Sequence, residues 1–177
     1  AGDTMKIFID GSAGTTGLRI KDRLMKRSDV ELITLSEEQR KDTESRKQAL
    51  NSAQVAFLCL PDAAAVEAVK LVENPDTVII DTSTAHRTSE GWAYGFPELS
   101  AEFEDKIKNS KRIAVPGCHA GGFIALVYPL IEAGVLGNDA LLSCYSLTGY
   151  SGGGKKMIAE YESEDKSSLL FAPRQYG

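Results

Sequence analysis

A glycine-rich turn near the start of the chain places the strongest constraint on its fold. A short β-prone run at residues 6–10 leads into a turn with the spacing G-x-x-G-x-x-G, and residues 18–25 have the pattern of an amphipathic helix. This order is typical of dinucleotide-binding folds, because the glycines permit a tight turn and a close approach of the backbone to a pyrophosphate. The phosphates then lie on N–H groups at the helix N-terminus. We predict that a dinucleotide binds here, through Gly11, Ser12, Ala13, Gly14, Thr15, Thr16 and Gly17. The alternative is a purely structural turn.

Further apolar runs extend the same pattern along the chain. They occupy residues 30–35, 53–60, 78–81 and 113–115, with helical patterns at 63–73 and 102–110. Nearly continuous apolar runs indicate parallel strands that are covered on both faces. The sequence therefore predicts an α/β fold with a Rossmann-like, doubly wound and mainly parallel sheet. We also expect Asp62 to be the N-cap of the helix at 63–73, and residues 91–99 to form a structured loop.

The residues after the second predicted strand bear on the choice of dinucleotide. An acidic residue there suits the ribose hydroxyls of NAD, whereas basic and hydroxyl groups suit the 2′-phosphate of NADP. Ser36 comes first and Arg40 follows shortly, but Glu37 and Glu38 lie between them. We predict NADP(H), with Ser36 and Arg40 at the 2′-phosphate. The alternative is a solvated, charged helix start that runs on to residue 49.

Polar residues after two further strands belong to the predicted ligand sites. Ligands of open α/β sheets bind at the carboxyl ends of the strands. Pro61 follows the third strand and Ser83 follows the fourth, and we assign both to the cofactor. Arg87 lies in the same polar cluster as Ser83, and its forked donors can bind a carboxylate or a phosphate. We assign Arg87 to the substrate, with an ordinary polar loop as the alternative.

Cys118 is the candidate nucleophile. An apolar run ends at Pro116-Gly117, the cysteine follows at the turn, and a new apolar segment starts after Gly122. A thiol near a helix N-terminus is favoured as the thiolate, which is the nucleophilic form. The other interpretation is a small buried hydrophobic residue, which is the usual place of a free cysteine.

The C-terminal part of the chain predicts the start of a second domain. We place a dinucleotide-binding domain at residues 5–117 and a partial α+β catalytic domain at 118–177. The second part contains a helix at 121–133 that Pro129 should kink or break, a β-prone run at 140–148 and a short helix at 157–164. Its glycine-rich turn at 149–156 could bind a phosphate or act as a flexible linker. Ser151 and Gly152 are its predicted substrate-binding residues. Residues 171–177 show no clear closing element.

Composition narrows the possible partners. The chain of 177 residues has a formal net charge of −5 and no block of Lys and Arg, which argues against a nucleic-acid partner. No apolar run approaches the ~20 residues of a membrane-spanning helix, and no signal peptide is visible. The three cysteines have no paired spacing, which favours a reducing, cytoplasmic compartment over disulfides or a metal site. Residues 1–4 precede Met5 and are expected to be an expression remnant.

The order of these motifs resembles N-acetyl-gamma-glutamyl-phosphate reductase, and most closely its shorter branch. The resemblance is carried by residues 11–17, 81–87, 92–98 and 115–122, with an extension at 146–154, and the P-G-C motif at Cys118 is its specific part. It implies that Cys118 attacks the acyl phosphate of N-acetylglutamyl phosphate, and that NADPH reduces the resulting thioester to the semialdehyde in arginine biosynthesis. It also implies a small-molecule substrate and a homo-oligomer for the full-length protein.

One departure from this family affects the expected activity. The resemblance implies that the acid–base histidine of the family lies in a segment that we expect to be missing from this chain. His119 is not assigned to that role, because adjacent helical residues do not face each other. We therefore expect a fragment that binds nucleotide and is inactive alone. The alternatives are an enzyme like aspartate-semialdehyde dehydrogenase and a dinucleotide-binding module that catalyses no reaction. A cysteine hydrolase is a third alternative, but the cofactor loop argues against it.

Overall fold

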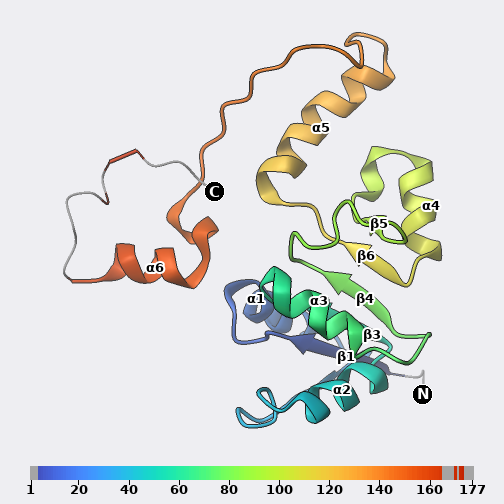
Figure 1. Ribbon diagram of the computed structural model, residues 1–177, viewed down its shortest axis with the longest axis vertical. Coiled ribbons are helices and arrows are strands. Elements are labelled where there is room, and N and C mark those ends of the chain that lie inside the picture. The colour runs from blue at the N-terminus through green and yellow to red at the C-terminus, as the bar shows by residue number, and fades with distance from the viewer. Residues whose placement is uncertain (1–3, 165–169, 171, 174–177) are drawn as a thin grey trace. The chain divides into compact units, whose positions relative to one another are not determined.

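A six-stranded parallel sheet is the centre of the first of two compact units. The computed structural model describes residues 4–164, 170, 172 and 173, and the two units comprise residues 1–141 and 142–177. Figure 1 shows the strands, which follow the order β2-β1-β3-β4-β6-β5 and pair in parallel throughout. They are β1 (Met5–Asp10), β2 (Val30–Ile33), β3 (Val55–Leu58), β4 (Val78–Asp81), β5 (Ala93–Tyr94) and β6 (Arg112–Ala114).

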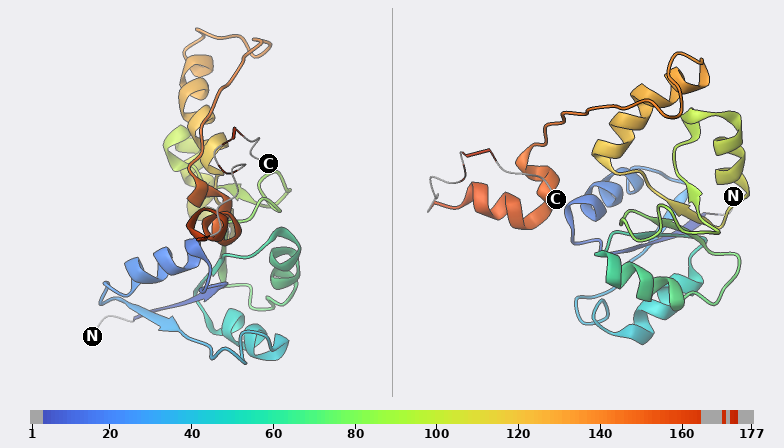
Figure 2. Two further views of the ribbon diagram at one scale, coloured as in Figure 1. Left: turned by 90° about the vertical axis from the view of Figure 1, so that its left-hand side faces the viewer. Right: turned by 45° about the horizontal axis from the view of Figure 1, so that its top comes forward.

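Helices cover both faces of this sheet. Figure 2 shows α1 on one face and α2 and α3 on the other. The order in which the chain adds strands reverses direction after β2, and right-handed connections therefore place α1 on one face and both α2 and α3 on the other. The fold is therefore Rossmann-like and doubly wound, as predicted, and its topological switch point lies between β1 and β3. The helices of this unit are α1 (Thr15–Leu24), α2 (Thr43–Ser52), α3 (Asp62–Lys70), α4 (Ala101–Asn109) and α5 (Cys118–Glu132).

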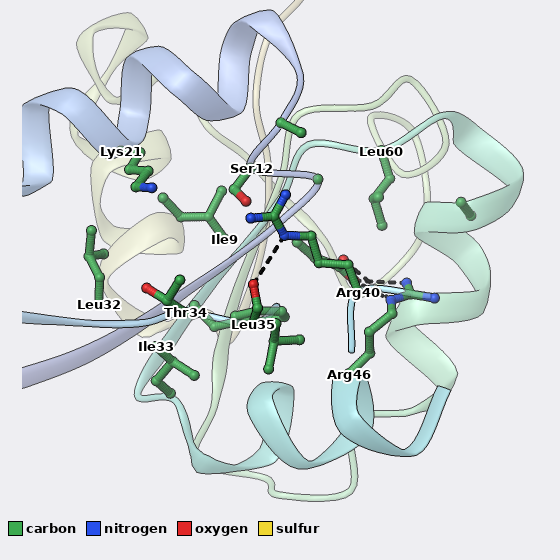
Figure 3. A pocket seen from close by; sticks show the side chains of 15 residues that line it. Ile9, Ser12, Lys21, Leu32, Ile33, Thr34, Leu35, Arg40, Arg46 and Leu60 are labelled. Carbon is green, nitrogen blue, oxygen red and sulfur yellow. Dashed lines mark hydrogen bonds and ion pairs between the residues drawn. The ribbon is translucent and has the colours of Figure 1, made fainter. Parts of the chain in front are cut away.

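The connection from β2 to α2 is not the charged helix that the alternative interpretation starts near Ser36 and continues to residue 49. Residues 36–42 form turns, and the Arg40 Nε donates a hydrogen bond of 3.2 Å to the Leu35 carbonyl oxygen (Figure 3). Helix α2 begins only at Thr43, because the carboxylate of Asp42 caps it by accepting a hydrogen bond of 2.7 Å from the Ser45 N–H. The turn leaves Arg40 beside the end of β2.

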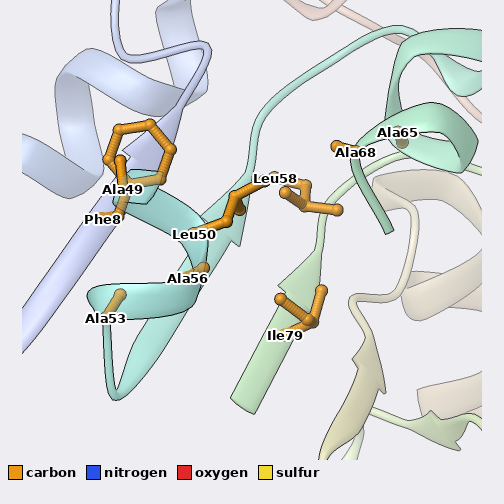
Figure 4. Packing of buried hydrophobic residues seen from close by; sticks show 9 residues of the cluster. All are labelled: Phe8, Ala49, Leu50, Ala53, Ala56, Leu58, Ala65, Ala68 and Ile79. Atoms are coloured by element: carbon orange, nitrogen blue, oxygen red, sulfur yellow. The ribbon is translucent and has the colours of Figure 1, made fainter. Parts of the chain in front are cut away.

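The hydrophobic core lies between the sheet and the pair α2 and α3 (Figure 4). Five of its nine residues are alanines, so these two helices pack closely on the strands. Leu50, Leu58 and Ile79 are fully buried and provide most of the apolar volume. The cluster comprises Phe8, Ala49, Leu50, Ala53, Ala56, Leu58, Ala65, Ala68 and Ile79.

Three local predictions for the first unit need correction. Asp62 is the first residue of α3 and not its N-cap, which is Pro61. The Asp62 carboxylate instead accepts hydrogen bonds from the Thr84 N–H and hydroxyl, and these bonds hold its pKa below the ordinary value. Residues 93–94 form the edge strand β5, which pairs with β6, within the stretch predicted as a loop. Helix α5 begins at residue 118 and continues through Pro129 to Glu132.

The second unit contains a short 3-10 helix followed by an α-helix. These are η2 (Tyr150–Gly153) and α6 (Gly154–Glu162), and the rings of Tyr150 and Tyr161 stack with centroids 5.0 Å apart. The predicted helix is present and begins three residues earlier than expected. The strand expected at 140–148 is wrong, because this fully described stretch has no ladder partner and leaves Leu147 exposed. Residues 171 and 174–177, for which no closing element was expected, lie outside the described part of the chain.

The compact units do not coincide with the predicted domains. Helix α5 belongs to the first unit, where Tyr128 packs edge-on against Phe103 of α4 with ring centroids 6.0 Å apart. The first compact unit therefore ends at residue 141. The functional boundary that we predict after residue 117 stays a prediction. No helix among the described residues is long and apolar enough to cross a bilayer.

Candidate active site

The glycine-rich turn is tightly packed against the ends of two strands. Gly11 has a φ of +83°, which favours glycine, and a β-carbon there would collide with the carbonyl oxygen of Cys59. The Gly14 N–H donates a hydrogen bond of 2.9 Å to the Gly11 oxygen, which closes the turn. A β-carbon on Gly17 would lie 2.5 Å from the same oxygen. Two of the glycines are thus required by close contact, and they place the start of α1 directly beyond the end of β1.

A pocket of about 220 Å³ lies beside this turn (Figure 3). It is bounded by the glycine-rich turn, the end of β2 and the start of α3. Four predicted cofactor residues line it, namely Gly11, Ser12, Ala13 and Arg40. Because it adjoins the switch point of the sheet, this pocket is the place where an open α/β fold binds its ligand.

The charges of the pocket are mainly positive. Among the described residues that line it, the charged ones are Asp10, Lys21, Arg40 and Arg46. The Nη2 of Arg46 lies 2.8 Å from Oδ2 of Asp10, and both side chains are largely buried. This ion pair leaves Lys21 and Arg40 to face an anionic ligand.

Sequence reasoning missed three of these charged residues. Lys21 lies one helical turn after Gly17, so the amphipathic pattern of α1 could have placed it on the side of the helix that faces the pocket. The pairing of Asp10 with Arg46 joins positions 36 residues apart, and no local pattern signals it.

Other predicted cofactor residues have protein partners of their own. The hydroxyl oxygen of Ser36 accepts a hydrogen bond of 3.2 Å from the Gln39 N–H. Ser83 is buried, and its hydroxyl donates a hydrogen bond of 2.7 Å to Asp81. Ser36, Pro61 and Ser83 are outside the described lining of the pocket, and their assignment to the cofactor stays a prediction. The same holds for Gly14, Thr15, Thr16 and Gly17.

Cys118 is the first residue of α5 and is exposed to solvent. The Gly121 N–H donates a hydrogen bond of 2.7 Å to the Gly117 oxygen, so helical bonding starts at the residue before the cysteine. The turn thus places the thiol in the first turn of a helix, where free backbone N–H groups favour an anion. Cys59, by contrast, is half-buried, and burial raises the pKa of its thiol to about 11. Cys59 is therefore protonated at neutral pH and unsuited to nucleophilic attack.

Arg87 reaches the turn that precedes Cys118. Its Nε donates a hydrogen bond of 2.9 Å to the Val115 oxygen, and its Nη2 donates one of 3.3 Å to the Thr82 oxygen. Its Nη1 lies 2.8 Å from the position that a β-carbon would take on Gly117. Strands β4 and β6 are neighbours, and this brings the predicted substrate-binding arginine and the predicted nucleophile to one edge of the sheet.

Ser151 and Gly152 belong to the second unit, and their substrate-binding role stays a prediction. Asp81 and His86 form a buried pair that the sequence reasoning missed, with Nδ1 of His86 2.6 Å from Oδ2 of Asp81. In the described part of the chain, no three His, Cys, Asp or Glu side chains are grouped to hold a metal ion.

Known proteins share this architecture and much of the sequence. The family description "Semialdehyde dehydrogenase, NAD binding domain" matches residues 6–109. The N-acetyl-gamma-glutamyl-phosphate reductase of Chelativorans sp. is 51% identical over 170 residues, which are 96% of this chain and 55% of that protein. That of Trichormus variabilis is 51% identical over 158 residues, which are 89% of this chain and 49% of that protein. The predicted resemblance is confirmed, and the chain spans about half the length of these relatives.

Solved structures confirm the fold. An aspartate semialdehyde dehydrogenase II of Vibrio cholerae, complexed with ASA, superposes with a TM-score of 0.65 at 19% identity, covering 90% of this chain and 51% of that one. An aspartate semialdehyde dehydrogenase of Candida albicans, solved with NADP, gives a TM-score of 0.55 at 18% identity, covering 74% of this chain and 48% of that one. The parallel sheet, the glycine-rich turn and the family match agree. This chain belongs to the semialdehyde dehydrogenase family, and it contains that family's NAD-binding domain.

Proposed function

We propose that the protein carrying this chain reduces N-acetylglutamyl 5-phosphate to the semialdehyde, with NADPH, in arginine biosynthesis. The observation that carries the proposal is the position of Cys118 in the first turn of α5, with Arg87 over the glycine that precedes it. Relatives named for this activity share 51% sequence identity with the chain over the matched residues.

The chemistry follows from these side chains. The Cys118 thiolate attacks the acyl carbon, the bond to the phosphate oxygen breaks, and inorganic phosphate leaves with the electron pair. NADPH, when bound, supplies the hydride that reduces the resulting thioester. Cys118 then departs as the thiolate and releases the semialdehyde. Arg87 offers its unused donors to the phosphate or carboxylate of the substrate, and Ser151 and Gly152 are proposed to contact the same substrate.

The pocket supports NADP(H) over NAD. Lys21 and Arg40 line it, whereas its one described acidic residue, Asp10, is paired with Arg46. A 2′-phosphate bound here would meet two cations and a carboxylate that is already paired with an arginine. We propose Arg40 as the main partner of that phosphate, and Ser36 as a further partner that would have to exchange its bond with Gln39.

Three properties of the whole protein belong to the same proposal. We propose a cytoplasmic location, because the reductase family is metabolic and the three cysteines form no disulfide, which suits a reducing compartment. We also propose a homo-oligomer. Neither His86 nor His119 is proposed as the acid–base residue. The Nδ1 of His86 is already bonded to Asp81, and His119 follows the nucleophile directly on α5.

The test is phosphate-dependent oxidation of N-acetylglutamate semialdehyde by the protein that carries this chain. We expect Cys118→Ser to abolish turnover, and Cys144→Ser, at another exposed cysteine, to leave it unchanged. Wild-type turnover by Cys118→Ser would overturn the mechanism. Faster turnover of aspartate semialdehyde would reassign the substrate to the aspartate-semialdehyde dehydrogenase type.

A non-catalytic dinucleotide-binding module is the second candidate. It is favoured by the fold itself, because the part of the family that matches this chain, at residues 6–109, is described as an NAD-binding domain. Selective alkylation of Cys118 at neutral pH would count against it. Absence of NADP and NADPH binding in calorimetry would overturn both candidates.

A further inference from the structure

A buried network lies at the end of β4, next to Arg87 in the chain, and none of its side chains takes part in the bond-making steps proposed above. The carboxylate of Asp81, at the end of β4, is fully buried. It accepts hydrogen bonds of 2.9 Å from the Ser83 N–H and 2.7 Å from the Ser83 hydroxyl, and Nδ1 of His86 lies 2.6 Å from it. The His86 ring stacks on Trp92, with centroids 4.1 Å apart and an interplanar angle of 11°. The imidazole is therefore held both at its edge and on its face.

This network connects directly to the turn before Cys118. The Val115 N–H donates a hydrogen bond of 2.8 Å to the main-chain carbonyl oxygen of Asp81. The main-chain carbonyl oxygen of Val115 accepts a hydrogen bond of 2.9 Å from the Arg87 Nε. Arg87 follows His86 in the chain, and His86 is bonded to the Asp81 side chain. Asp81 thus fixes the end of β6 with its main chain and the residue before Arg87 with its side chain.

We propose that Asp81 and His86 are positioning residues that hold the Arg87 guanidinium over Gly117, the residue before Cys118, before any substrate binds. A long arginine side chain has many rotamers, and ordering it in advance removes this cost from the binding step. Burial of a carboxylate is costly unless its oxygens accept hydrogen bonds, so the bonds from Ser83 and His86 to Asp81 are strongly favoured to stay formed. The anionic group that Arg87 receives rests on the proposed function, but the positioning of Arg87 does not.

Alkylation of Cys118 tests the positioning without any enzyme assay. Iodoacetate and iodoacetamide react with a thiolate by the same substitution, but only iodoacetate is negatively charged. The ratio of their rates at Cys118 therefore reports a nearby fixed cation, whereas a general loosening of the fold changes both rates together. The chain is used with Cys144→Ser, and mass spectrometry of the peptide that contains Cys118 gives both rates.

Matched variants separate the hydrogen bond from the ring. His86→Phe keeps a flat ring for Trp92 and removes the nitrogen that bonds Asp81, and His86→Asn supplies an amide donor in its place. We expect Arg87→Met and His86→Phe each to lower the ratio about threefold, since one cation near the thiol changes attraction by this order. We expect His86→Asn to restore at least half of the loss. In the Arg87→Met background, His86→Phe should have no further effect.

The proposal is overturned if Arg87→Met lowers the ratio and folded His86→Phe does not. It is equally overturned if Arg87→Met leaves the ratio unchanged, or if the two changes are additive. Should His86→Phe fail to fold, Ser83→Ala, which removes one donor from Asp81, allows the same comparison.

A second assay distinguishes this proposal from the function it accompanies. In the protein that carries this chain, His86→Phe should raise the KM for phosphate about tenfold and leave the KM for NADP unchanged. If the alkylation results hold and no phosphate-dependent activity exists, the proposed function fails and the positioning stands. If the activity exists and the alkylation ratio is insensitive to His86, the positioning fails alone.

Discussion

The guanidinium of Arg87 fills the space that a side chain at Gly117 would need. Its Nη1 is 2.8 Å from the position of a β-carbon built on that glycine. The backbone of Gly117 has a φ of −74° and a ψ of 153°, which any residue can adopt. A β-carbon at the glycine of the P-G-C motif would therefore displace the guanidinium of an arginine from a neighbouring strand end, although the backbone conformation of Gly117 would accept it.

Replacement of Gly117 tests this contact. We expect Gly117→Ala to displace Arg87 and to lower kcat/KM for the acyl phosphate at least about tenfold, with unchanged NADP affinity. Gly122→Ala is the matched control, since no atom of the described residues lies within 4 Å of a β-carbon there. Equal activity of the two variants would contradict the steric explanation.

The glycine-rich turn gives a second prediction. A β-carbon on Gly17 would lie 2.5 Å from the Gly11 oxygen, so α1 must shift away from the turn. We expect Gly17→Ala to lower the free energy of unfolding by about 2 kcal/mol and to weaken NADP binding, measured by urea denaturation and calorimetry. Gly149→Ala, with open space among the described residues and a φ of −75°, should change neither.

Dinucleotide choice is expected to depend on Lys21 and Arg40, which line the pocket and form no ion pair among the described residues. Lys21→Met and Arg40→Met should each weaken NADP binding by about tenfold, or 1.4 kcal/mol, because each removes one partner of the 2′-phosphate. NAD binding should change little in either variant. Lys26→Met, just beyond the end of α1, serves as the control for loss of charge alone. Equal losses for NAD and NADP would mean that neither cation contacts the 2′-phosphate.

The ion pair in the pocket predicts a rescue. Arg46→Met leaves the largely buried Asp10 carboxylate without its partner, and we expect this to cost about 3 kcal/mol of unfolding free energy. Addition of Asp10→Asn should recover most of the loss, because it removes the uncompensated charge. A double variant no more stable than Arg46→Met would show that packing of the arginine stem, and not charge, supports this site.

Cys59 predicts a dependence of stability on alkaline pH. Burial raises the pKa of its thiol from 9.0 to about 11, so the folded state retains this proton at a pH where the unfolded chain loses it. The resulting stability is present below pH 9 and is lost as the pH rises towards about 11. Denaturation across this range should show a fall that is larger for the wild type than for Cys59→Ala, by about 2 kcal/mol. Parallel curves would contradict the buried thiol.

The sequence was a good guide where structure depends on neighbouring residues. Strand β4 matches its predicted bounds, and α4 and β6 are each displaced by one residue. Predictions failed where a tertiary contact decides the outcome. Asp62 does not cap α3 because it binds Thr84, and residues 140–148 form no strand because a strand needs a partner.

The sequence by itself determined strands β1 to β4 and β6, the glycine-rich turn and the place of Cys118 at a strand–helix junction. These follow from apolar periodicity and from the stereochemistry of glycine and proline, which act over a few residues. Only the tertiary structure decided which residues meet: Asp10 with Arg46, Asp81 with His86, and Arg87 with Gly117. The strand order places distant segments side by side, and no local pattern records which side chains then share a low-dielectric space.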